Sequence, residues 1–170
     1  MPGFTTEGAS PVSPAETFAA IVDLSQWSSF KGRGPIPGIM SAVWTGKTHG
    51  PGARVRVENT DGSVHHEVFD EYVTGARLVI RMELGQPAAR VLRSIVETVE
   101  LRASANGTRI VRSFDLAPRF WFTWPIAWLM ANVFLRRAVE AHNAWLAASL
   151  ARSDRRRGTY EARDEGPVNP

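Results

Sequence analysis

Residues 117–150 read APRFWFTWPIAWLMANVFLRRAVEAHNAWLAASL and form the longest segment of the 170-residue chain in which apolar residues recur periodically. This stretch holds four of the six tryptophans, and none of residues 120–135 is charged. The spacing of its apolar residues predicts one long helix from about Trp124-Pro125 to Leu150. We expect a sheet formed by the preceding residues to wrap around this helix, with the functional site in the space between them.

The two halves of this helix have different patterns. One face of the second half is expected to face the core and carries Leu135, Val139, His142 and Leu146. The opposite, polar face carries Arg136, Glu140 and Asn143. The first half, residues 120–135, is apolar nearly all round but shorter than the ~20 residues that span a bilayer. We expect it to be either a lid over a cavity or a surface that docks on a membrane or a protein.

The sequence before Pro118 predicts short strands and two early helices. Ser13 suits a helix N-cap, Pro14 the first helical position and Glu16 the reciprocal partner of the cap. A second short helix is expected at 25–30, followed by the glycine- and proline-rich loop GRGPIPG. Strands are predicted at 5–9, 39–45, 53–59, 78–84 and 91–103, with further strands completing two hairpins.

Asp61-Gly62 is a two-residue hairpin signal between the strand at 53–59 and the next one. With these residues as the turn, His66 lies opposite Val57 on the apolar face. This register predicts that His66 points inward and His65 outward. Because neighbouring residues of a strand point to opposite faces, the two histidines cannot bind one metal ion, and we expect no metal site.

Asn106-Gly107 is a second hairpin signal. With these residues as the turn, the apolar faces of the two flanking strands match, and Glu97 and Arg112 point inward. A carboxylate or histidine in an apolar cavity could move protons, and Arg112 could hold an enolate or a carboxylate. The competing interpretation is that these side chains satisfy one another in the core.

Composition restricts the classes of function. Hydrophobic residues make up 44% and charged residues 22% of the chain, as in an ordinary globular domain. The absence of cysteine excludes disulfides and thiolate chemistry and fits a cytoplasmic location. A net charge of only +3 argues against a nucleic-acid partner. We expect one domain over residues 1–150 and a disordered, charged tail over residues 151–170.

Several short motifs together resemble the START-like, helix-grip superfamily, also called SRPBCC or polyketide cyclase/dehydrase-like. They are VSPAETF followed by Asp23 and Trp27, the G-x-x-x-G-P-G turn at 46–52, Glu67-Val68, Arg77-Leu78 and Gly107-Thr108. The resemblance covers Thr5 to about Leu150. It implies an α+β fold in which a curved antiparallel sheet of six to seven strands grips the C-terminal helix around an apolar cavity.

The resemblance also implies binding of a small hydrophobic molecule, without a catalytic set shared by all members. Members bind lipids, sterols, polyketides or plant hormones; some are cyclases, dehydratases or hydrolases, and others bind a protein. We therefore expect a lipid- or polyketide-like ligand and no cofactor. The alternative is a cyclase/dehydratase-type enzyme that uses His66, Glu97 and Arg112.

The wall of the expected cavity is predicted from the aromatic residues, one methionine and the inward histidine of the last helix. The candidate ligand-binding residues are Trp27, Phe30, Trp44, Met82, Phe114, Trp124, Trp128 and His142. Ordinary core packing is the competing role for each aromatic residue. A third functional alternative is contact with a membrane or a protein through residues 120–135; the sequence does not predict the oligomeric state.

Overall fold

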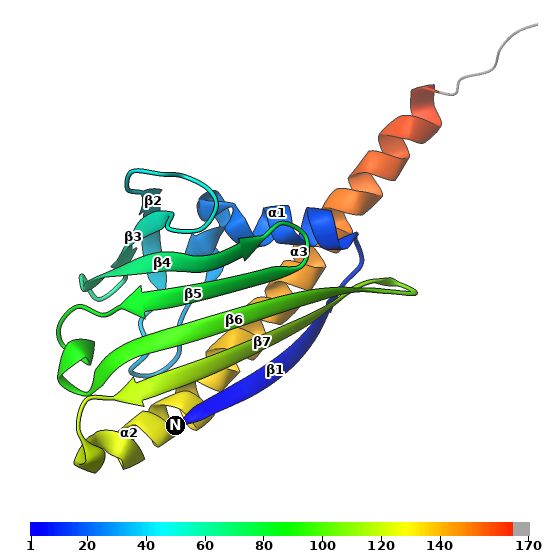
Figure 1. Ribbon diagram of the computed structural model, residues 1–170. Helices are drawn as coiled ribbons and strands as arrows, with labels where there is room; N and C mark the ends of the chain where they lie inside the picture. The colour runs from blue at the N-terminus through cyan, green and yellow to red at the C-terminus, as the bar shows by residue number, and fades with distance from the viewer. Residues whose placement is uncertain (165–170) are drawn as a thin grey trace, which may run out of the picture.

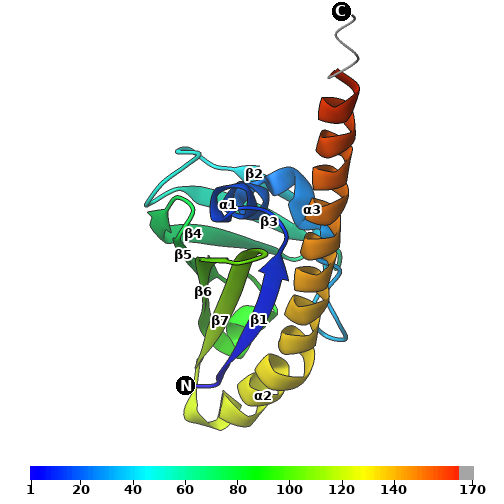
Figure 2. The ribbon, with the colours of Figure 1, turned by 90° about the vertical axis from the view of Figure 1, so that its right-hand side faces the viewer.

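The computed structural model describes the backbone of residues 1–164 and the side chains of residues 1–156. Seven strands form one antiparallel sheet in the order β1-β7-β6-β5-β4-β3-β2. They are β1 (Gly3–Ser10), β2 (Ile39–Trp44), β3 (Arg54–Asn59), β4 (Val64–Val73), β5 (Arg77–Glu83), β6 (Leu92–Ser104) and β7 (Gly107–Pro118). The sheet is curved, and the C-terminal helix runs along its concave face (Figures 1 and 2). The predicted α+β helix-grip fold is therefore confirmed.

The early helices form where the capping signals predict. Helix α1 (Pro14–Val22) begins after Ser13, whose backbone N–H donates to Glu16 Oε2 at 3.2 Å while its hydroxyl accepts the Glu16 N–H at 3.3 Å. A 3₁₀ helix (Leu24–Ser29) follows, with Asp23 as its N-cap. Helix α1 lies across one end of the sheet (Figure 1). These two helices leave the long face of the sheet to the C-terminal helix.

The C-terminal helix is not the uniform helix that the sequence predicts. It begins with α2 (Trp124–Leu129), continues as a π-helical segment (Met130–Leu135) and ends as α3 (Arg136–Asp164). Short 3₁₀ turns also occur at Ala88–Arg90 and Trp121–Thr123. Pro125 lies in the first turn of α2, as expected, because it needs no N–H donor there.

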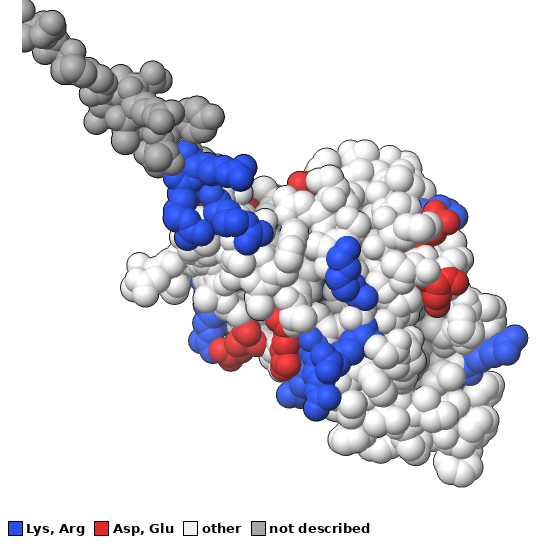
Figure 3. All heavy atoms as spheres, turned by 180° about the vertical axis from the view of Figure 1, so that it is seen from behind, with Lys and Arg blue, Asp and Glu red and all other residues white. Residues whose placement is uncertain are grey.

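Helix α3 extends into the segment that the sequence analysis assigns to a charged tail. It continues to Asp164, and residues 165–170 lie outside the described residues; a disordered tail stays a prediction. Alanine and arginine have high helix propensity, and extending an existing helix needs no new nucleus. Figure 3 shows basic side chains gathered where this extension leaves the body of the molecule.

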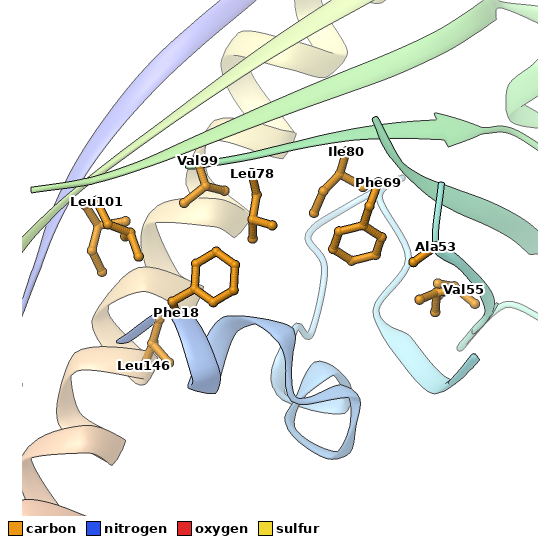
Figure 4. Packing of buried hydrophobic residues seen from close by; sticks show 11 residues of the cluster. Phe18, Ala53, Val55, Phe69, Leu78, Ile80, Val99, Leu101 and Leu146 are labelled. Carbon is orange, nitrogen blue, oxygen red and sulfur yellow. The ribbon is translucent and has the colours of Figure 1, made fainter. Parts of the chain in front are cut away.

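Two apolar clusters join the helices to the sheet. In the first, Phe18 of α1 packs among Leu78 and Val99 of the sheet and Leu146 of α3 (Figure 4). The second contains residues of β1, β6 and β7 together with the C-terminal helix: Phe4, Leu92, Phe114, Leu116, Ala127, Ala131, Leu135 and Val139. Full burial of one such large side chain contributes about 1.5–3 kcal/mol. The two clusters therefore hold α3 against the sheet at two points along its length.

The hairpin between β3 and β4 has a different register from the predicted one. Val57 pairs with His65, because the loop has three residues instead of two and closes with the Asn59 N–H donating to the Ser63 carbonyl at 2.9 Å. Gly62 ends the loop at φ 81°, a left-handed conformation that suits such a turn. A shift of one residue moves every side chain of the strand to the opposite face of the sheet. The prediction that His66 points inward is thus wrong: His66 is exposed, and His65 faces the concave side.

The hairpin between β6 and β7 is displaced by two residues from the prediction, which preserves the faces. Ala105 and Asn106 form the loop, and Ser104 pairs with Gly107. Gly107 has φ 123°, and a Cβ there would lie 2.1 Å from the carbonyl oxygen of Ser10. The close approach of β1 therefore places the glycine beside the loop instead of inside it.

Candidate functional site

A cavity of about 420 Å³ lies between the sheet and the C-terminal helix. Its wall is mainly apolar and includes Trp27, Phe30, Ile80, Met82, Ile95, Phe114, Leu116 and Leu135. Exposed residues of three loops and α2 also line it and mark where it opens: Pro35, Asp61, Gln86, Pro87, Ala88 and Ile126. A cavity of this volume and lining suits a small molecule with a large apolar body.

A buried ion pair crosses the floor of the cavity. Glu97 on β6 and Arg112 on β7 both point inward, as predicted, and their side chains are 6% and 12% exposed. Arg112 Nε donates to Glu97 Oε1 at 2.6 Å, and Arg112 Nη2 lies 2.6 Å from the same oxygen. Both contacts involve Oε1, so Oε2 has no hydrogen-bond donor among the described side chains. The pair therefore leaves one carboxyl oxygen for a ligand.

The helix supplies the remaining partners of Arg112. Its Nη1 lies 3.1 Å from His142 Nδ1 and also donates to Asn143 Oδ1 at 3.1 Å. His142 Nε2 in turn lies 3.2 Å from the hydroxyl of Ser29. Since arginine only donates, His142 accepts through Nδ1 and carries its proton on Nε2. A polar chain thus connects the sheet, the last helix and the early 3₁₀ helix.

His142 is neutral in this environment. Burial, together with the nearby Arg112 guanidinium, lowers its pKa to about 3. The ring stacks on Trp145 at 5.9 Å and meets Phe30 edge-on at 5.8 Å. A histidine with so low a pKa is a poor proton acceptor near neutral pH, so His142 positions Arg112 instead of taking protons.

Glu97 is the titratable group whose properties suit chemistry in the cavity. Burial raises its pKa, the Arg112 guanidinium opposes that increase, and the charge of Glu67 adds to it. A carboxyl group with a raised pKa can give or take a proton closer to neutral pH than an ordinary one. Glu97 is therefore the acid or base candidate of this site.

A second polar group lies on the same face and was missed from the sequence. His65 Nε2 lies 3.2 Å from Glu67 Oε1, and its Nδ1 lies 3.1 Å from Asn59 Nδ2. Asn59 also donates to the Ser63 hydroxyl at 3.0 Å. All four side chains line the cavity. The His-x-Glu spacing at 65–67 is the signal that could have indicated them, since residues two apart share a strand face.

Asn143 is a second missed residue. The sequence places it on the polar face of the helix, but it is buried, and its amide nitrogen lies 3.4 Å from the hydroxyl of Thr6. Arg136, also expected to face water, is half-buried, with its guanidinium carbon 5.4 Å from the centre of the Phe4 ring. Strand β1 lies against α3, so the helix buries a wider sector than a single amphipathic stripe.

Five of the eight predicted wall residues line the cavity: Trp27, Phe30, Met82, Phe114 and His142. Trp44 does not, because it packs on Phe69 at a ring distance of 5.5 Å in the core. Trp124 and Trp128 do not either; both are about half exposed on α2. The small residues Ala127 and Ala131 occupy the buried face there, which directs the tryptophans outward.

The part of the chain that the structure describes was also compared with two other kinds of structure, a membrane-spanning helix and a metal site. None of the helices in this part of the chain combines the length and apolar character needed to cross a bilayer. In the same part, no three or more His, Asp or Glu side chains lie close enough to hold a metal ion.

Comparison with known proteins relates this architecture to a family. The model of the family described as "Polyketide cyclase / dehydrase and lipid transport" matches residues 1–152. The chain belongs to this family. Among proteins of curated function, none matches the sequence. Membership agrees with a fold that holds hydrophobic ligands, and the resemblance proposed from short motifs is confirmed.

Solved structures share the fold at low sequence identity. The crystal structure of Ara h 8.0201 is 20% identical, with a TM-score of 0.61 over 86% of this chain and 97% of that one. Ms6760 from Mycobacterium smegmatis is 10% identical, with a TM-score of 0.62 over 89% and 92%. The di-domain ARO/CYC StfQ from the steffimycin biosynthetic pathway is 12% identical, with a TM-score of 0.66 over 90% of this chain and 51% of that one. At these identities the likeness shows the helix-grip fold of the family and nothing narrower.

Proposed function

We propose that this protein binds a small amphipathic molecule, with an apolar body and a hydroxyl or carbonyl group, in the cavity between sheet and helix. The observation that carries this proposal is the apolar cavity of about 420 Å³ with a buried carboxyl group, Glu97, in its wall. An apolar cavity with a few polar groups is the usual form of a small-molecule site. The family description, which includes lipid transport, supports the same class of ligand.

The two kinds of wall would hold the two parts of the ligand. Met82, Ile95 and Leu116 would contact the apolar body. Glu97 Oε2 would accept a hydrogen bond from a ligand hydroxyl or, when Glu97 is protonated, donate one to a ligand carbonyl, since the other oxygen is already engaged by Arg112.

Two measurements test this proposal. Native mass spectrometry of the gently purified chain should detect a bound small molecule, and dansyl-labelled undecanol should become fluorescent on binding. The Met82→Trp substitution fills the cavity and should weaken binding of the probe at least tenfold. Val43→Trp, on the exposed side of β2, is the matched control and should bind as the wild type does. Equal affinities for the two variants, with both folded, would place the probe outside the cavity and contradict the proposal.

A second candidate function is proton transfer at a carbonyl compound, and the raised pKa of Glu97 favours it. In a dehydration, the Glu97 carboxylate would take the proton from the carbon next to the carbonyl. The bond to the β-hydroxyl would then break, and the same proton would leave with that hydroxyl as water. Arg112 supports Glu97 electrostatically, whereas exposed His66 has no part in this scheme.

Glu97→Gln separates this candidate from simple binding. The probe substrate is 4-hydroxydecan-2-one, whose dehydration gives a conjugated enone that is followed by its ultraviolet absorbance. An enzyme should lose at least a hundredfold in rate with Glu97→Gln while still binding the dansyl probe. If wild type and Glu97→Gln produce the enone at the rate seen without protein, the protein binds this class of compound without dehydrating it.

A further inference from the structure

The start of the C-terminal helix exposes a group of large apolar side chains, of which only Ile126 also lines the cavity. We call it the aromatic patch; it consists of Phe120, Trp121, Phe122, Trp124, Ile126, Trp128 and Leu129. Each is at least 46% exposed, and Trp121 reaches 88%. Phe120 and Phe122 stack on each other at 5.2 Å, and Trp121 meets Phe122 edge-on at 6.0 Å. A contiguous apolar surface of this kind marks a site of contact with another molecule.

The charges around the aromatic patch are mainly positive. Residues 84–96 and 116–139, which include the patch, contain five arginines and no acidic residue. The exposed Asp115 lies on β7 five residues before the patch begins, opposite Val96. The visible part of this end in Figure 3, at the lower right, is almost free of charged side chains apart from basic ones at its border. The patch is therefore an apolar surface with a basic edge, complementary to an apolar partner with negative charges.

The arginines nearest the patch differ from the others on the sheet. Elsewhere on the sheet, arginines pair with carboxylates: Arg54 with Glu83, Arg77 with Glu100, Arg81 with Asp70 and Arg109 with Glu7. By contrast, Arg93 donates to the main-chain carbonyl of Arg119 at 3.2 Å, and Arg119 to that of Ala89 at 3.3 Å. Neither has an ion-pair partner among the described residues. Their positive charges are thus left for a partner outside the chain.

The two arginines and the aromatic side chains border one hollow in the surface. Arg93, Arg119, Phe120, Trp121 and Trp124 line it, together with Pro118. An arginine can hold a phosphate with two donors in a fixed geometry, and aromatic rings favour the boundary between headgroups and acyl chains. The hollow therefore combines the two kinds of side chain that a phospholipid headgroup requires.

We propose that the aromatic patch docks this protein on the surface of an anionic lipid bilayer, with Arg93 and Arg119 holding lipid phosphates. The described helices are unable to span a bilayer, so the first part of the C-terminal helix would lie in the interface. Binding to a protein requires a surface that is complementary in shape to that protein. Docking on a bilayer requires only the apolar surface and the basic edge seen here, so we infer a bilayer.

Docking in this orientation would bring the cavity opening to the bilayer. Ile126 belongs to both the patch and the cavity lining, and Ala88 and Val91 line the cavity beside Arg90 and Arg93. This part of the inference rests on the proposed function: a hydrophobic ligand could then pass between bilayer and cavity with little exposure to water.

The test is co-sedimentation with vesicles of phosphatidylcholine alone and of phosphatidylcholine with a quarter of phosphatidylglycerol. The wild type should bind the anionic vesicles, and less so at high salt, which screens the arginines. Trp121→Ser with Phe122→Ser should weaken binding to both vesicles at least tenfold. Arg93→Gln with Arg119→Gln should weaken binding to the anionic vesicles about 30-fold, since each arginine near an anionic surface contributes a factor of about five.

Two control variants change residues far from the patch: one replaces apolar side chains that are also exposed, and the other removes the same number of positive charges. Met40→Ser with Val43→Ser changes two exposed apolar residues of β2, and Arg102→Gln with Arg109→Gln removes two charges from the β6–β7 hairpin region. Both should bind vesicles as the wild type does. No binding of the wild type to anionic vesicles, or equal losses in the controls, would overturn the proposal.

Two further outcomes separate docking on a bilayer from dimerisation and from ligand binding. A dimer in analytical ultracentrifugation that Trp121→Ser/Phe122→Ser dissociates, without vesicle binding, would show that a second copy covers the patch and would overturn the proposal. Binding of the dansyl probe separates docking from ligand binding: docking predicts that this double variant keeps probe affinity. If the wild type binds vesicles but not the probe, docking stands and the proposed cavity function fails.

Discussion

Arg112 is the residue on which the site depends, because it connects three elements while nearly excluded from water. It reaches Glu97 on the neighbouring strand and both His142 and Asn143 on the helix. Taking a guanidinium and a carboxylate out of water costs several kcal/mol each, and only complete pairing offsets that cost. The stability of this pair should therefore depend on both partners being present.

Removing one partner should destabilise the fold more than removing both. Arg112→Met leaves Glu97 buried without its counter-charge, and we expect a loss of about 3–5 kcal/mol in the free energy of unfolding. Adding Glu97→Leu should restore a large part of that loss, because no buried charge then remains. Urea denaturation of the two variants and the wild type measures both effects. A double variant as unstable as Arg112→Met alone would show that packing, not charge, is the main contribution.

His142 should make stability depend on pH on the acid side. Its pKa is about 3 in the folded protein and near the ordinary 6.5 in the unfolded chain. Between these values the unfolded state binds more protons, so the contribution is full above pH 6.5 and is lost as the pH falls toward 3. His142→Gln, which keeps a hydrogen-bonding side chain, should reduce that loss. The measurement is the free energy of unfolding of both chains across this pH range; parallel curves would contradict the assigned environment of His142.

At the scale of elements, each of the two hairpins has a glycine at or beside its loop, and the two glycines are required for different reasons. Gly62 ends the β3–β4 loop, and a Cβ there would meet nothing within 4 Å. Gly107 stands beside the β6–β7 loop, where a Cβ would meet the main chain of Ser10 and Pro11. Both have positive φ, but only at Gly107 does the close approach of β1 also leave no room for a side chain.

Alanine at the two glycines should separate these causes. Gly62→Ala should cost about 1–2 kcal/mol, the usual strain of a left-handed residue that carries a Cβ. Gly107→Ala should cost more than twice as much, because it adds a backbone clash with the end of β1. Thermal and urea unfolding measure both. Equal losses at the two positions would mean that the β1 contact relaxes without cost.

At the scale of the whole molecule, the helix-grip body and the end of α3 are separable. Leu146 is buried in the first cluster and Leu150 packs at its edge, whereas residues 152–156 are exposed. The two ends of the C-terminal helix also lie at opposite ends of the molecule (Figure 1). Residues 152–156 therefore contribute little to the core or to the cavity.

Shortening the chain should reveal where the domain ends. A chain that ends at Ser153 should keep its free energy of unfolding within about 0.5 kcal/mol, since the helix beyond this point leaves the body of the molecule. A chain that ends at Trp145 also loses Leu146 and should be strongly destabilised or unfolded. Circular dichroism during thermal unfolding compares the two. A large loss for the longer chain would mean that the helical extension supports the fold.

Much of this fold follows from local patterns. The strands β3 and β5, the cap at Ser13 and the proline at the start of α2 depend on neighbouring residues, and the structure has them as predicted. The site was predicted less well. Glu97 and Arg112 were placed correctly because an error of two residues keeps the strand face, whereas His66 was misplaced because an error of one reverses it.

The sequence alone therefore determined the fold class, the gripped helix and an inward carboxylate-arginine pair, because short-range periodicity sets which residues share a face. Only the tertiary structure decided the rest. The contact with β1 buries Asn143 and requires Gly107 beside the hairpin loop, and the three-residue loop turns His65 and Glu67 into the cavity. The packing of Ala127 and Ala131 against the sheet left Trp124 and Trp128 outside. These outcomes depend on distances between segments far apart in the chain, which no local pattern contains.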